Sequence, residues 1–183
     1  MLVLLASATA AAEGPYVTTT CSPGPCPTVL EPARRPASIV ADLGLSVIHV
    51  GYQHPIGRHL AVSLTAGIFG TYFLPWFDLG DDVKGLGAGL RGTWFAHEDG
   101  RGFYVAPYVR VHGVRGEHDD LEGSGPGVTA GAFAGWAFGL GEKLDLQLGL
   151  GAQYIYQSID TDAGKQTSST PFIAIDIVLG YRL

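Results

Sequence analysis

The chain has 183 residues, a formal net charge of −6 at pH 7 and only 15% charged residues, whereas about 25% is typical of soluble domains. Its eleven lysines and arginines are scattered along the sequence. Because nucleic-acid binding requires clustered positive charge, this composition excludes a nucleic-acid partner. The length suits one domain, and no stretch of the sequence offers the roughly 20 apolar residues that a transmembrane helix needs.

Residues 1–12 form a short apolar run that ends in alanines, which predicts a signal peptide cleaved after Ala12. Residues 13–36 follow as a proline-rich segment that contains Cys21 and Cys26. Export would place both thiols in an oxidising compartment, where a local disulfide between them is favoured. Two thiols without a neighbouring histidine or a second cysteine pair supply too few ligands for a zinc site.

From Ala37 onward the sequence alternates between apolar and polar residues, which is the pattern of strands with one apolar face. Seven such runs cover residues 39–47, 60–72, 86–97, 103–112, 128–138, 144–157 and 173–183. In the last run, every second residue from Ile173 to Leu183 is apolar, and Asp176 and Arg182 lie on the opposite face. We therefore predict an all-β fold, an antiparallel up-and-down barrel of about eight strands, over residues 37–183.

The polar faces of these runs combine charged residues with glycines. In a barrel of about eight strands the side chains just fill the lumen, and buried aspartates and arginines would satisfy each other there as ion pairs. The predicted polar network of the lumen consists of Asp42, Arg91, Arg110, His112, Asp145, Asp176 and Arg182. The apolar faces would then meet lipid, with aromatic residues near the strand ends at the two membrane interfaces.

Short and long links between the runs alternate. The short ones lie at residues 54–59, 98–102 and 140–143, and the long ones at about 74–84, 116–126 and 159–170. Outer-membrane barrels have short periplasmic turns and long external loops, and an even number of strands. The missing strand is either residues 13–20, where Tyr16 to Thr20 have high β-propensity, or, if 13–36 is a periplasmic leader, a strand elsewhere in the barrel.

This pattern resembles the small bacterial outer-membrane β-barrel family, the OmpA/OmpX-like eight-stranded proteins, over roughly residues 37–183. The last run is similar to the C-terminal assembly signal of that family, although Leu183 stands where the family usually has phenylalanine. The resemblance implies a monomer in the outer membrane of a Gram-negative cell envelope. It also implies contact with outer-membrane lipid and lipopolysaccharide, insertion by the barrel-assembly machinery through the C-terminal strand, and a structural or surface-interaction role.

Two other functions are open alternatives. A lipid-modifying enzyme of the outer membrane would use a histidine and a serine near the outer rim; His97, His112, His118 and Ser124 are present, but no His-x-Ser pair stands on a strand. A soluble lipocalin-like carrier would need an apolar interior and a polar exterior. We predict no catalytic, cofactor or metal site, because the acidic residues at 78–82 and 117–122 suit solvated external loops and the glycines of 85–92 lie inside a strand.

Overall fold

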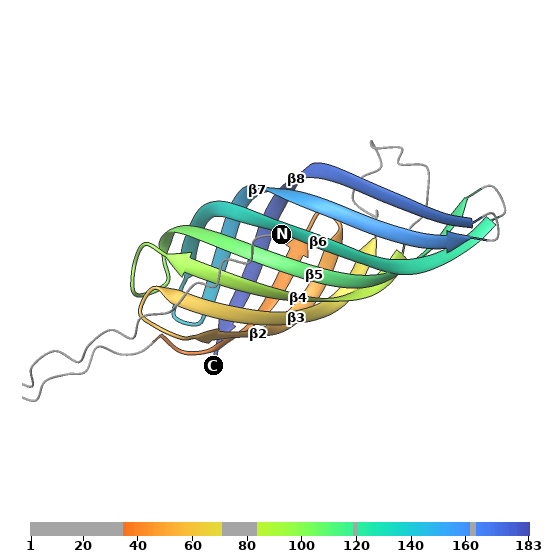
Figure 1. The fold of residues 1–183 in the computed structure, drawn as a ribbon. Coiled ribbons are helices and arrows are strands. Elements are labelled where there is room, and N and C mark those ends of the chain that lie inside the picture. Colours follow the sequence, from red (N-terminus) through yellow and green to blue (C-terminus); the bar gives the residue numbers. More distant parts are fainter. Residues whose placement is uncertain (1–34, 71–83, 119–120, 162–163) are drawn as a thin grey trace, which may run out of the picture. The chain divides into compact units, whose positions relative to one another are not determined.

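The computed structural model describes residues 35–70, 84–118, 121–161 and 164–183. They form a closed barrel of eight antiparallel strands, each paired with its neighbours in sequence (Figure 1). The strands are β1 (Ser38–Gly44), β2 (Val47–Pro55), β3 (Leu60–Gly70), β4 (Lys84–Phe95), β5 (Gly102–His118), β6 (Leu121–Leu140), β7 (Leu144–Thr161) and β8 (Gly164–Arg182). The predicted fold class is confirmed. In the described ranges no helix is long and apolar enough to cross a membrane.

The eighth strand comes from a hairpin in the first predicted run. Residues 39–47 were predicted to be one strand with Val47 on the apolar outer face, and this is wrong: the chain reverses at Leu45 and Ser46, and Gly44 pairs with Val47. Val47 consequently faces the lumen and is 3% exposed. The turn escaped prediction because Leu-Ser lacks the Asn-Gly or Asp-Gly signature of a two-residue turn. The barrel closes without residues 13–20, which lie outside the described residues, as do Cys21 and Cys26.

The register fixes the dimensions of the barrel. The row of paired residues that starts at Asp42 passes through β2 to β7 and reaches Ser168 on β8, whereas Asp42 itself pairs with Val178, ten residues further along that strand. Eight strands with this shear are tilted by about 40° and lie about 8 Å from the barrel axis. Such a barrel has room for side chains and little else.

The two ends of the barrel differ. We call the end that carries Ser38, Leu183 and the turns at 56–59, 96–101 and 141–143 the terminal end, and the opposite one the far end. At the terminal end all eight strands stop at nearly the same level, but at the far end the β1–β2 hairpin stops about 20 Å lower than β5 to β8. Figure 1 shows these four strands extending past the others.

Two of the predicted long links are therefore largely strand. Most of residues 116–126 continue β5 and β6, and most of 159–170 continue β7 and β8. These strand ends are rich in glycine, serine and threonine and have no alternating apolar face, so alternation does not reveal them. Most of the third predicted long link, 74–84, lies in residues 71–83, outside the described residues.

The barrel is apolar outside and polar inside. Outward positions expose large apolar side chains; Leu64, Leu86, Leu150 and Ile173 are each more than 60% exposed. Inward positions bury serine, threonine, glutamine, aspartate and arginine side chains. Two aromatic groups border the apolar surface. The one near the terminal end contains Tyr52, Trp94, Phe103, Trp136, Phe138 and Tyr181, and the one toward the far end contains Tyr154 and Tyr156.

Candidate functional site

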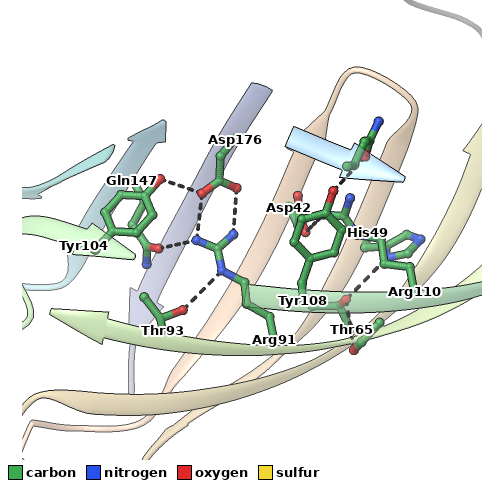
Figure 2. Close-up of polar contacts among 12 residues, drawn as sticks. Asp42, His49, Thr65, Arg91, Thr93, Tyr104, Tyr108, Arg110, Gln147 and Asp176 are labelled. Atoms are coloured by element: carbon green, nitrogen blue, oxygen red, sulfur yellow. Dashed lines mark hydrogen bonds and ion pairs between the residues drawn. The ribbon is translucent and has the colours of Figure 1, made fainter. Parts of the chain in front are cut away.

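The polar lumen is the candidate site. All seven residues of the predicted network lie on the lumen side, and six of them form three ion pairs: Arg91 with Asp176, Arg110 with Asp42, and Arg182 with Asp145. Each strand brings its charged residue inward because the neighbours on either side are apolar and face outward. Figure 2 shows the first two pairs. The first joins β4 to β8 and the second joins β5 to β1.

The pair of Arg91 and Asp176 is bidentate and fully buried. Both Nη atoms of Arg91 lie 2.7 Å from an Asp176 carboxylate oxygen. Tyr104 donates a hydrogen bond of 2.5 Å to the same carboxylate, and Arg91 donates to Gln147 at 3.0 Å and to Thr93 at 3.2 Å. These bonds satisfy both charges where water does not reach, since Arg91 is 6% and Asp176 0% exposed.

The second pair lies nearer the far end. Arg110 donates to Asp42 at 2.6 Å, and its guanidinium lies 4.4 Å from the centre of the Tyr108 ring. Tyr108 in turn donates to Gln153 at 2.7 Å and stacks on Phe133, with 4.6 Å between ring centres. The guanidinium is thus held by a carboxylate and by an aromatic face, a combination that suits the planar guanidinium of arginine better than the ammonium of lysine.

Glycines on the lumen side make room for these large side chains. A Cβ atom at Gly149 would lie 2.5 Å from the Tyr104 hydroxyl, and one at Gly89 would lie 3.0 Å from Cγ of Arg110. Both distances are shorter than ordinary van der Waals contact. The mixture of glycine and charge that suggested a narrow lumen in the sequence therefore has a direct steric reason.

Two histidines occupy the lumen and join no ion pair with the residues that the structure describes. The predicted member His112 stacks on Phe69, with 4.0 Å between ring centres. His49 was not predicted; its Nδ1 lies 3.3 Å from the Thr65 hydroxyl. The signal for it was present, since the inward positions of β2 include His49, Gly51 and Gln53, but it becomes visible only once the β1–β2 turn is recognised.

Two arginines lie at the terminal end of the lumen. Arg182 makes two 2.6 Å hydrogen bonds to Asp145. Arg35, from the chain before β1, lies 4.1 Å from the centre of the Phe95 ring and donates to Gln53 at 3.2 Å. Burial lowers the pKa of the Arg35 guanidinium, and the opposite charge of Asp145 offsets part of this shift. Arg35 was not predicted because it lies in the proline-rich segment, outside any alternating run.

The residues considered for catalysis lie at different levels of the barrel. His97 lies in the turn between β4 and β5 at the terminal end, Ser124 lies on the far-end part of β6, and His112 is buried between them. Over the described ranges no group of three or more His, Cys, Asp or Glu residues could hold a metal ion. Comparison of the chain with known protein families, with curated proteins and with solved structures found no match.

Proposed function

We propose that the protein is a small β-barrel of the bacterial outer membrane, with a closed lumen and a structural or surface-interaction role. The observation that carries this proposal is the polarity of the barrel: charged pairs lie inside and leucine, isoleucine and valine side chains lie outside. A soluble monomer rarely exposes a contiguous apolar patch larger than a few hundred Å². A lipid environment removes the cost of this surface, and the buried ion pairs offset part of the cost of burying charge in the lumen.

The dimensions of the apolar surface support the same proposal. From the register, the level of Trp136 and Tyr181 and the level of Tyr154 and Tyr156 are separated by about 25 Å along the barrel axis. Transmembrane barrels have an apolar band of about this height, bordered by aromatic residues at both interfaces. Beyond the second level the outward residues of β5 to β8 become polar, with Arg115, Asp160 and Lys165.

In this proposal the terminal end faces the periplasm, since short turns and the C-terminus lie there in outer-membrane barrels. The C-terminal strand β8 would be recognised by the barrel-assembly machinery during insertion. The outer surface of the barrel contacts outer-membrane lipid, and the far end meets lipopolysaccharide and the medium.

The interaction role is assigned to the part of β5 to β8 that rises above the apolar band. The register places its tip about 15 Å beyond the level of Tyr156. Strand β1 covers β8 only from Val178 to Arg182, so β1 does not pair with residues 165–171. In this proposal residues 165–171, which no described strand pairs on the β1 side, accept an extended segment of a partner through backbone hydrogen bonds.

The alternatives fit the geometry less well. A lipocalin-like carrier needs a ligand cavity with an apolar lining, and this lumen is occupied by buried arginines, aspartates and tyrosines. A lipid-modifying enzyme needs its histidine and serine at one rim, and His97 and Ser124 lie at opposite ends. Catalysis therefore has no assembled set of groups among the residues that were considered for it.

Fractionation tests the proposed location. We expect the protein in the outer-membrane fraction, with faster migration on a gel when the sample is not boiled, because a folded transmembrane barrel resists denaturation by detergent. Recovery in a soluble fraction, or identical migration with and without boiling, would contradict the proposal. Capture of peptides on the β8 edge can be tested separately, since a failure there leaves the membrane location intact.

A further inference from the structure

Arg35 lies before the first strand, yet its side chain reaches into the mouth of the lumen at the terminal end. Its guanidinium contacts Gln53 of β2 and Phe95 of β4. Both partners face inward and are buried, with exposed fractions of 3% and 0%. The side chain of Arg35 therefore crosses the opening from the β1 side toward β4 instead of lying on the outer surface.

The turn between β4 and β5 leaves space for the guanidinium of Arg35. Gly100, in the turn between β4 and β5, has a φ of +77°, and a Cβ atom there would overlap the guanidinium of Arg35. Glycine favours the backbone conformation at this position and leaves free the space that Arg35 occupies. Asp145 lines the same mouth and acts on Arg35 as an opposite charge.

We propose that Arg35 is a stopper: a side chain of the segment before the barrel that seals the terminal mouth of the lumen. An aromatic face, an amide oxygen and a glycine cradle are features that a planar guanidinium fits better than an ammonium does. Because Arg35 belongs to the chain that enters the barrel, displacement of that chain removes the stopper and admits water to Phe95 and Gln53. The layer of Arg91 and Asp176 lies deeper, so the stopper controls a vestibule and not a through-channel.

Cysteine reactivity tests this proposal in the folded, full-length chain. Cys21 and Cys26 are first replaced by serine, and Ala137→Cys supplies a reporter that is 2% exposed and belongs to the same buried cluster as Phe95. With Arg35 present, a charged methanethiosulfonate should label Cys at 137 slowly. Arg35→Ala should accelerate labelling by about tenfold or more, since it removes a hydrogen bond and a cation–π contact. In the Arg35→Lys variant, labelling of the reporter should be as fast as in the Arg35→Ala variant.

Two controls separate a stopper from a general loosening. Arg58→Ala removes an exposed arginine of the same rim that pairs with Glu98, and it should leave the rate unchanged. A second reporter, Val114→Cys, lies buried toward the far end, and Arg35→Ala should not alter its rate. Equal rates in the Arg35→Ala and Arg58→Ala variants, or equal acceleration at both reporters, would overturn the proposal. If Ala137→Cys does not fold, Ser38→Cys, buried at the same end, replaces it.

Discussion

Removing one partner of the pair between Arg91 and Asp176 should destabilise the barrel more than removing both. Asp176→Ala leaves a guanidinium without its two 2.7 Å hydrogen bonds, and it also takes the acceptor from Tyr104. Arg91 is 6% exposed and cannot recover these bonds from water. Breaking a buried pair in this way costs about 3–5 kcal/mol.

The double variant Arg91→Met with Asp176→Leu removes both charges and keeps most of the volume. Its cost should be within about 1–2 kcal/mol of wild type, because apolar replacement of a buried pair is often close to neutral. The single variants Arg91→Met and Asp176→Leu complete the double-mutant cycle, and each should cost about 3–5 kcal/mol because it leaves one charge without its partner. The coupling between the two positions should therefore be at least about 4 kcal/mol.

The assay is equilibrium unfolding in urea of protein refolded in lipid vesicles, followed by gel migration and tryptophan fluorescence. Arg58→Ala is the matched control, because Arg58 forms an exposed pair with Glu98 at 3.4 Å and should change stability by less than about 0.5 kcal/mol. If the effects of the single substitutions at Arg91 and Asp176 simply add up in the double variant, the reasoning about the buried pair is refuted.

Three further predictions concern the lumen. Gly149→Ala should destabilise the barrel by about 1–3 kcal/mol in the same assay, because its Cβ would overlap the Tyr104 hydroxyl. The control Gly92→Ala has open space around the added Cβ and should change stability by less than about 0.5 kcal/mol. Equal effects of the two substitutions would contradict the steric account. Tyr104→Phe removes a hydrogen bond to a charged carboxylate and should cost about 1.5–3 kcal/mol, whereas Tyr108→Phe removes a hydrogen bond to a neutral amide and should cost about 1 kcal/mol. A larger loss of stability in Tyr108→Phe than in Tyr104→Phe would contradict this reasoning. In planar bilayers the wild-type protein should show no large, stable conductance, and a steady open channel would disprove a closed lumen.

The inward and outward faces of most strands could be predicted because side chains alternate strictly along a strand. The contacts between inward residues of different strands could not be predicted. Arg91 and Asp176 are 85 residues apart, and they lie at the same level only because the barrel closes with a shear of ten residues. No local pattern encodes this shear, since it results from the register of all eight ladders together.

The features that were not predicted share one cause. Each lies where the alternation of apolar and polar residues ends, or where it continues through a turn. The β1–β2 turn keeps the apolar rhythm through Leu45, so His49 and Val47 were not recognised as inward residues. The far-end parts of β5 to β8 have no alternating apolar face, and their sequences resemble those of loops. Arg35 precedes the first strand, and only the folded barrel brings it over Phe95.

A leucine-to-arginine comparison tests the central claim that the outer surface faces lipid. Leu90 and Leu140 are almost equally exposed, at 51% and 49%, but Leu90 lies near the middle of the apolar band and Leu140 at the last residue of β6, beside the terminal-end turn. In vesicles, Leu90→Arg should destabilise the barrel by about 2–4 kcal/mol and Leu140→Arg by about 0–1 kcal/mol, because the cost of arginine depends on depth in the bilayer. Equal and small effects at both positions, as expected for a surface that faces water, would contradict the account.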